Sequence, residues 1–356
     1  MGSERLGRRL DLAGGALAGA AVGWTFVSAA SGGGTPVPVA TLIGASAVVV
    51  ALSRLAATFA GRWLVPAGIV AVALAVAVLG GDLLSRSPLQ GPFGYANAAG
   101  AFFVQAAVAG LMLAAATASA PARIFGAGAC IAFAAVPFMR DAVAAAAVVA
   151  LLPVVFLARA PRQRKILIAS WGALVAVALS TTILLGGTFE PGPAAGPVER
   201  SAARLLSERR LELWHDALQI MREHPWGGVG PGRFREVSAT ALADRDAAWA
   251  HSGFLQQGAE QGVVGLALIV LFVVWAFARL LAVSAPDLVT VLGAVSVGSL
   301  GLLASIDYVL HFPAVPLAAA ALLGTAIAGT GRTAARGAHV DRAERWEGDG
   351  IEISGS

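Results

Sequence analysis

The chain has 356 residues, of which 57% are hydrophobic and only 13% are charged. Charged residues make up roughly a quarter of an average soluble protein, so this composition excludes an ordinary soluble domain and predicts that most of the chain lies in lipid. The net charge of +4 does not favour nucleic-acid binding. Most basic residues stand in short segments beside apolar runs, where they set membrane orientation. The single cysteine, Cys130, excludes an intrachain disulfide and the usual cysteine-based metal sites.

The predicted elements are membrane-spanning helices. A helix needs about 20 apolar residues to cross the hydrocarbon core, and the sequence offers about ten such segments. The first uncharged run, 12–53, is interrupted by glycine and proline at 31–36 and predicts two helices. The further spans are predicted at 63–81, 98–120, 124–139, 142–158, 166–187, 254–278, 288–306 and 309–330. The fold class is therefore an all-α, polytopic transmembrane helical bundle.

Two of these predicted spans, 124–139 and 142–158, are short and separated only by Arg140 and Asp141. One long helix over both would place the two charges near the middle of the membrane, at a cost of several kcal/mol. Two separate spans are therefore the better interpretation, with the charged pair at the outer surface.

Basic residues mark one side of the predicted bundle. When the spans are counted alternately, this side receives both termini, the connections 54–62 and 159–165, Arg123 and Arg279. Loops rich in Lys and Arg remain in the cytoplasm, so this side is predicted to be cytoplasmic. The protein is then a multi-pass protein of the plasma (inner) membrane, and the Asp307-Tyr308 turn lies outside.

The domain organisation follows from the spans. The predicted units are about seven N-terminal transmembrane helices in 1–187, a large extracytoplasmic loop in 188–253, about three C-terminal helices in 254–330, and a disordered cytoplasmic tail in 331–356. The loop holds eight Arg, nine Asp or Glu, and no Lys. Arginine suits planar, bidentate recognition of phosphate or carboxylate, although codon bias also favours it over lysine.

Residues 199–223 of the loop are predicted to form an amphipathic helix, because apolar residues recur there at helical spacing. Such a helix lies on the membrane surface or on the helical bundle. Arg210 stands at the edge of its apolar face, one turn before the tryptophan. That face is formed by Leu211, Trp214, Leu218 and Met221.

A glycine-rich turn, Gly228-Val229-Gly230-Pro231-Gly232, follows this helix. Glycine lets the backbone approach a partner closely, and turns with free N–H groups can bind phosphate. A plain tight turn is the alternative interpretation. In the next span Glu260 is expected to have a partner, because an unpaired charge there is costly.

The loop and the following span carry three motifs. The segment RLELWHDALQIMREHPWGGVGPGRF at 210–234 contains Arg-x-x-x-Trp and His-Pro-x-x-Gly-x-Gly-x-Gly-x-Phe. The segment AHSGFLQQGAEQGVVGL at 250–266 contains Ala-His and then Glu-x-Gly-x-x-Gly-Leu. Together these motifs resemble the O-antigen ligase and polymerase family. The resemblance extends roughly from Gly91 to the last span, and it includes Arg140 and the 91–97 turn before a span.

The resemblance implies a GT-C-like architecture and a membrane glycosyltransferase without a cofactor or metal. The donor would be a glycan on a polyprenyl diphosphate in the membrane lipid, and the acceptor a hydroxyl of a glycan, lipid or protein. Arg140 and Arg210 would neutralise the diphosphate leaving group, and His251 would assist the acceptor hydroxyl, with inversion at the anomeric carbon. The implied substrate-binding residues are Asn97, Trp214, Gly228, Gly230, Gly232 and Arg233.

The residues alone leave plainer roles open. His251 can be a structural group at the membrane interface, Arg140 can pair with Asp141, and Asn97 can cap a helix. Two other function classes also remain. A flippase or transporter of lipid-linked glycans would place charged or broken helices at the membrane midplane, and a scaffold for envelope assembly would need no catalytic trio. The sequence does not separate ligase from polymerase.

Overall fold

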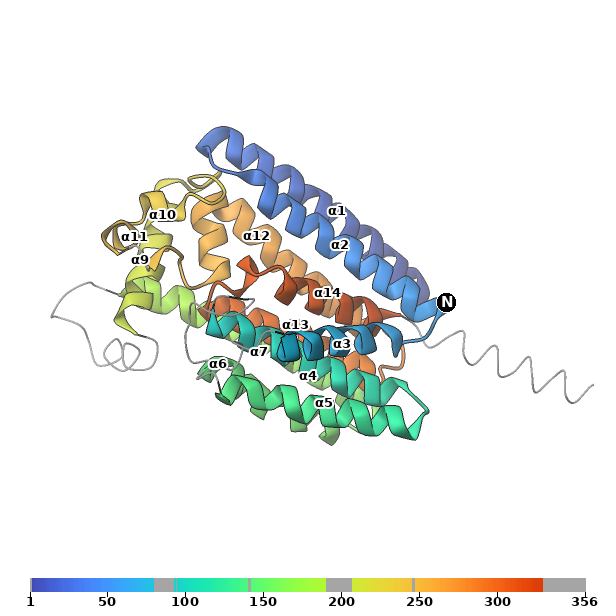
Figure 1. Cartoon of the computed structure of the whole chain (residues 1–356). Coiled ribbons are helices and arrows are strands. Elements are labelled where there is room, and N and C mark those ends of the chain that lie inside the picture. The colour runs from blue at the N-terminus through green and yellow to red at the C-terminus, as the bar shows by residue number, and fades with distance from the viewer. Residues whose placement is uncertain are drawn as a thin grey trace, which may run out of the picture.

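The structure, a computed structural model, describes residues 2–79, 93, 95–139, 142–189, 207–244 and 247–328. Within these ranges the chain forms helices and no β-strand, as the composition and the apolar runs predict (Figure 1). The long helices lie side by side in one bundle, and short helices gather at one of its ends. The predicted tail, 331–356, and the residues 190–206 of the loop lie outside the described residues.

Each predicted span has a helical counterpart. The first half of the bundle consists of α1 (Gly2–Gly32), α2 (Pro36–Phe59), α3 (Leu64–Leu79), α4 (Ala96–Ala116), α5 (Ala120–Met139), α6 (Val143–Ala150), the 3₁₀ helix η2 (Leu152–Leu157) and α7 (Pro161–Thr188). The second half consists of α9 (Glu208–Glu223), α10 (Phe234–Val237), α11 (Ala239–Ala243), α12 (Gly253–Leu281), α13 (Leu288–Ile306), the 3₁₀ helix η4 (Val309–His311) and α14 (Ala314–Ile327).

Seven described helices are long and apolar enough to cross a membrane, namely α1, α2, α4, α5, α7, α12 and α13. The other apolar segments, α3, α6 with η2, and α14, are shorter. The count of ten spans therefore stays a prediction. One continuous helix over 309–330 is wrong, because the chain forms η4 and a turn before α14. Pro313 explains the break, since a proline disfavours helical conformation in the preceding residue.

Two helices form the centre of the bundle. In α4 and α13, 83% of the most apolar stretch is buried, against 17% to 33% in the other five long helices. The two are joined by Gln105, which donates to Ser299 Oγ at 3.1 Å and accepts from Ser296 Oγ at 2.6 Å. The peripheral helices thus present faces to lipid.

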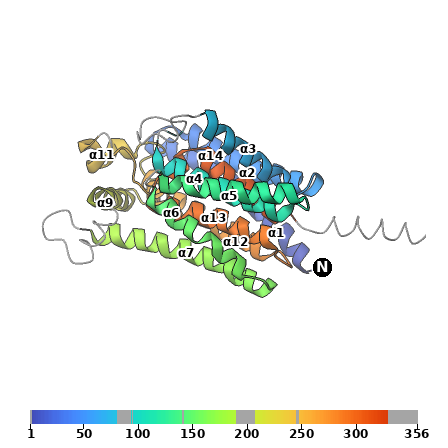
Figure 2. The same ribbon diagram turned by 60° about the horizontal axis from the view of Figure 1, so that its bottom comes forward.

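Basic residues gather at one end of the bundle, called here the basic end. Asp11 of α1 forms ion pairs with Arg54 at 2.6 Å and Arg279 at 2.7 Å, and Arg62 pairs with Asp287 before α13. The short helices α9, α10 and α11 occupy the opposite end, called here the loop end (Figures 1 and 2). Arg54, Arg62 and Arg279, which the alternate counting of spans assigns to one side, therefore lie together at the end opposite α9, α10 and α11.

A cysteine pair tests which end faces the cytoplasm. In a Cys130→Ala background, we expect Gln219→Cys, exposed on α9, to react with a membrane-impermeant thiol reagent on intact cells. Ala160→Cys, exposed before α7 at the basic end, should react only after the cells are opened. The reverse labelling pattern would overturn the orientation predicted from the basic residues.

A break in α12 connects the bundle to the glycine-rich turn. The break lies at Gly262, with φ 69° and ψ −172°, and an ideal Cβ there would lie 2.1 Å from Trp226 O. Only glycine fits this position. The interrupted backbone pairs instead with the turn, through Val229 N to Ala259 O (3.0 Å), Gly230 N to Glu260 O (2.8 Å) and Val263 N to Pro225 O (2.7 Å).

Candidate active site

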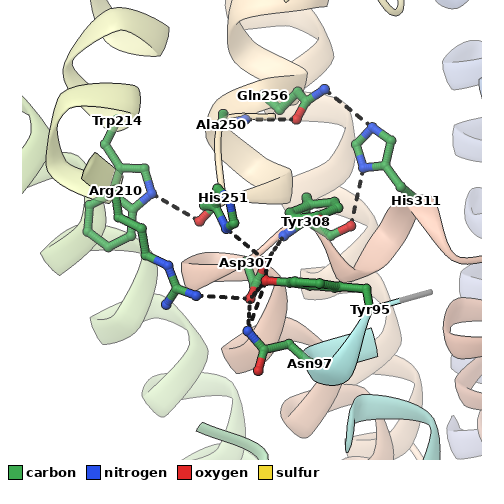
Figure 3. A network of polar contacts seen from close by, with 10 residues as sticks. All are labelled: Tyr95, Asn97, Arg210, Trp214, Ala250, His251, Gln256, Asp307, Tyr308 and His311. Carbon is green, nitrogen blue, oxygen red and sulfur yellow. Dashed lines mark hydrogen bonds and ion pairs between the residues drawn. The ribbon is translucent and has the colours of Figure 1, made fainter. Parts of the chain in front are cut away.

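Asp307 is the centre of a polar cluster at the loop end (Figure 3). It follows the last residue of α13, and its side chain is only 5% exposed. Its carboxylate accepts hydrogen bonds from Tyr95 Oη at 2.7 Å, from Asn97 Nδ2 at 2.6 Å and from its neighbour's backbone, Tyr308 N, at 2.8 Å. Arg210 Nη2 and His251 Nδ1 each lie 3.3 Å from one of its two oxygens.

The cluster is assembled from four helix ends. Asn97 is on the first turn of α4, Arg210 on the first turn of α9, His251 precedes α12 and Asp307 follows α13. The cluster therefore brings together two residues of the loop and two residues of the bundle's central helices. The suggested helix-cap role of Asn97 is wrong, because Tyr95 occupies the N-cap of α4 and the Asn97 amide binds Asp307 instead.

The amphipathic helix of the loop is confirmed from Glu208 to Glu223, whereas its predicted start at 199 lies outside the described residues. Leu211, Trp214 and Leu218 are buried, and α9 packs on α7 and α12. It therefore lies on the helical bundle. Burial of this face holds Arg210 toward Asp307. Trp214 itself is fully buried and donates from Nε1 to His251 O at 3.0 Å.

His251 is held in an unusual backbone conformation, with φ 47°. A non-glycine residue there is uncommon and strained, so it persists only where its surroundings fix it. Trp214 fixes its carbonyl, and Gly253 N donates to Asp307 O at 3.1 Å. The approach of Nδ1 to Asp307 is a close electrostatic contact and not a well-aligned hydrogen bond. Nε2 has no partner among the described residues and is the nitrogen left for a substrate.

The electrostatics of the cluster favour an ionised Asp307. Burial alone would raise the pKa of Asp307, but His251, Arg210 and Tyr95 outweigh it and hold that pKa below its ordinary value. Burial and the neighbouring carboxylate raise the pKa of Tyr95 well above its ordinary value and that of Tyr308 to about 12. The carboxylate therefore stays negative and both phenols stay protonated near neutral pH.

Aromatic rings cover one side of the cluster. Tyr95 stacks on Tyr308 with centroids 4.7 Å apart and on Phe312 at 5.8 Å. Trp249 lies over Tyr308 at 6.0 Å and over His311 at 4.4 Å. This wall limits the access of water to Asp307, and electrostatic interactions are stronger in such surroundings.

The N–H groups of the glycine-rich turn form hydrogen bonds within the protein. Gly228, Gly230 and Gly232 have positive φ, of 65°, 98° and 79°. Gly228 N donates to His224 O at 3.1 Å, Gly230 N to Glu260 O at 2.8 Å and Gly232 N to Glu260 Oε2 at 2.8 Å. The phosphate interpretation required free N–H groups, and here the same groups bind the protein itself. Direct substrate contact by these glycines stays a prediction that this arrangement does not favour.

Glu260 has the partners that its burial requires. It accepts from Gly232 N, from Phe234 N at 3.3 Å and from Gln256 Nε2 at 3.0 Å. Arg233, a predicted substrate ligand, instead donates to Gly32 O and to Glu236 at 2.9 Å. These contacts tie the turn to the connection between α1 and α2, away from the described contacts of Asp307.

Arg140 lies outside the described residues, and its catalytic role stays a prediction. The chain next to it is described, because Ala142 packs against Gly100 of α4. An ideal Cβ on that glycine would lie 2.8 Å from Ala142 Cβ. Gly100 is about one helical turn from Asn97. Ala142, two residues after Arg140, therefore lies near the first turn of α4, from which Asn97 binds Asp307.

Sequence reasoning missed Asp307, Tyr95 and Gln256 as site residues. A signal for the first was present, since Asp307 is the one charged residue between 288 and 331 of the sequence. Isolated charges in apolar regions are costly and usually functional. The other two carry no such signal, because neutral polar residues near helix ends are common and serve many roles.

Part of the site lies in a segment that matches a known protein family. The sequence description of the family O-antigen ligase matches residues 127–270. This range includes Arg210, His251 and Glu260, and it ends before Asp307. A search among curated proteins gave no match to the chain. The family match supports the resemblance seen in the motifs: residues 127–270 are similar to the O-antigen ligase family, in a chain with seven described helices long and apolar enough to cross a membrane.

Proposed function

We propose that the chain transfers a glycan from a polyprenyl-diphosphate carrier to an acceptor hydroxyl at the loop end of the bundle. The observation that carries this proposal is the convergence of Arg210, His251 and Asp307 from three helix ends. The family is of the ligase or polymerase type, which supports transfer of a lipid-linked glycan. The prediction from the basic residues puts this end outside the plasma membrane.

Arg210 is suited to the diphosphate leaving group. A guanidinium carries five N–H donors in a planar fork. One amino group of Arg210 faces Asp307, and no other partner of this guanidinium is found among the described residues. The remaining donors can bind two phosphate oxygens at once, where negative charge grows in the transition state. Arg140 is proposed to act with it, as the family resemblance implies.

His251 is suited to take the acceptor proton. With Nδ1 beside Asp307, its Nε2 accepts the hydroxyl proton while the acceptor oxygen bonds to the anomeric carbon. The bond between that carbon and the diphosphate oxygen breaks, and its electron pair leaves with the diphosphate. Asp307 stabilises the resulting imidazolium, in the way that a buried carboxylate supports a catalytic histidine in other enzymes. Attack opposite the leaving group inverts the anomeric centre.

Transport of a lipid-linked glycan is the alternative that one observation favours. Transporters place broken helices at the membrane midplane, and α12 is broken at Gly262. However, residues 263–281 alone are about 28 Å long and match a hydrocarbon core of about 30 Å. The break then falls near the membrane surface, and its freed carbonyls are bound by the glycine-rich turn and Ser28. Transfer is therefore the function supported best.

Arg210→Lys tests the bidentate role. The variant keeps the positive charge but loses the planar fork, so we expect transfer to fall at least about 10-fold with normal insertion. The measurement is transfer from a polyprenyl-diphosphate glycan by protein of equal yield, with Arg209→Lys as the neighbouring control. Near-wild-type transfer by Arg210→Lys would reduce Arg210 to a general electrostatic role.

The same assay in EDTA tests whether the arginines replace a metal. Wild-type transfer is expected to persist in EDTA. Loss of transfer that a divalent ion restores would defeat this part of the mechanism, and Asp141, Asp244 and Asp246 would become the candidate ligands.

A further inference from the structure

Gln256 of α12 joins three separate parts of the protein. It is 2% exposed, and every polar atom of its amide has a partner (Figure 3). Oε1 accepts from Ala250 N at 3.2 Å, and Nε2 lies 3.0 Å from Glu260 Oε1 and 3.3 Å from His311 Nε2. A buried amide that is fully satisfied in this way fixes the groups around it, because each lost bond would leave a polar atom unpaired.

The contacts of His311 define its tautomer. Nδ1 lies 3.2 Å from Tyr308 O, a carbonyl that can only accept, so Nδ1 carries the proton. Nε2 then has a free lone pair, which accepts the second N–H of Gln256. In this arrangement both contacts of the ring are hydrogen bonds. His311 thereby connects α12 to the backbone that directly follows Asp307.

The two ends of this bridge are the sequence neighbours of the two residues in the proposed proton-transfer pair. Ala250 immediately precedes His251, whose positive φ must be imposed by its neighbours. Tyr308 immediately follows Asp307 and donates to its carboxylate. The bridge Ala250–Gln256–His311–Tyr308 therefore connects the backbone before His251 to the backbone after Asp307.

We propose that Gln256 and His311 are positioning residues, which set the orientation of the His251 ring relative to Asp307. This inference rests on the proposed transfer function. It also gives the glycine-rich turn an indirect role. Gly232 N and Phe234 N hold Glu260, Glu260 holds the Gln256 amide, and that amide holds the backbone before His251. The turn then supports the catalytic histidine through these bonds, without touching substrate.

Two replacements of His311 test its two hydrogen bonds separately, the one with Gln256 and the one with Tyr308 O. Glutamine offers a carbonyl oxygen near the position of Nε2 and can still accept from Gln256. Asparagine offers an N–H near the position of Nδ1 and keeps only the bond to Tyr308 O. We expect His311→Asn to lower kcat by about 10- to 100-fold with an unchanged KM for the donor, because small misplacements of a catalytic group cost that much. His311→Gln should stay within about 3-fold of the wild type, as should the control His224→Asn on the exposed end of α9.

Equal kcat values for His311→Asn, His311→Gln and the wild type would overturn the proposal, and so would a change in donor KM alone. The positioning role can also be tested by NMR, which does not require transfer activity. In protein with ¹⁵N-labelled histidine, the ¹⁵N shifts of His251 should change in His311→Asn and stay near the wild-type values in His311→Gln. Unchanged His251 shifts in both variants would contradict the positioning role, whatever reaction the protein catalyses.

Discussion

Glycan transfer by His251→Ala is expected to fall by about 100- to 10,000-fold, the range that general-base catalysis contributes. Arg210 would still bind the diphosphate in this variant, so the affinity for the donor should change much less than turnover. The measurement is kcat and donor KM for purified protein. His224→Ala serves as the control, since the side chain of that histidine is exposed and its contacts at the end of α9 are made by the backbone, which alanine keeps.

A structural role for His251 predicts a different pattern. A purely structural histidine, whose side chain packs beside the buried Asp307, would lower protein yield and donor binding together when replaced. An unchanged kcat in well-folded His251→Ala would rule out the proposed proton transfer.

Asp307→Asn is expected to cause a loss of comparable size, about 100- to 10,000-fold in kcat. Asparagine keeps the shape of the side chain, but it cannot stabilise an imidazolium, and its amide would face the donors Tyr95 and Asn97. Asp287→Asn is the control, because Asp287 is also an ion-paired aspartate at an end of α13, but it is only partly buried and lies at the basic end. The control should lose stability without losing kcat, and equal losses of kcat in both variants would contradict the role of Asp307.

The stability lost in Asp307→Asn is also expected to depend on pH. The pKa of Asp307 is held below its ordinary value, so the stability gained from its ionised form is present above the unfolded-state pKa of about 3.9. That gain is lost as pH falls through the lower, folded-state pKa. Below about pH 4 the difference in Tm between wild type and Asp307→Asn should therefore shrink. A difference that does not shrink over this acidic range would contradict an ionised Asp307 in the folded protein.

Much of the fold could be predicted because charge and hydropathy act locally. The span 288–306 coincides with α13, since Asp287 caps its start and Asp307 follows its end. The break in α12 could not be predicted, because glycine is frequent in membrane helices and this break depends on the 225–230 turn, which is distant in sequence. Central and peripheral helices could not be told apart either, because core and lipid both select apolar residues.

The candidate site, too, could be predicted only in part from the sequence. Arg210 and His251 could be identified because their motifs resemble a family, and the helical spacing of Trp214 predicted a buried face. The role of Asp307 depends on bringing the end of α13 to α9 and to the residue before α12, which only the three-dimensional fold reveals. The glycine-rich turn suggested phosphate because its N–H groups were assumed to be free. They are occupied by acceptors of the protein itself: Glu260 accepts from Gly230 N and Gly232 N, and the carbonyls of His224 and Ala259 accept from the other two.

Transfer by purified protein in lipid vesicles is the most direct test of the proposed function. The substrates would be a synthetic polyprenyl-diphosphate glycan and an envelope extract containing acceptors, with mass spectrometry of both products. The proposed mechanism predicts that wild-type protein releases free polyprenyl diphosphate in equal amount to the glycan joined to acceptor, and that His251→Ala releases neither. Intact donor that moves across the vesicle membrane without any released diphosphate would contradict transfer and indicate transport.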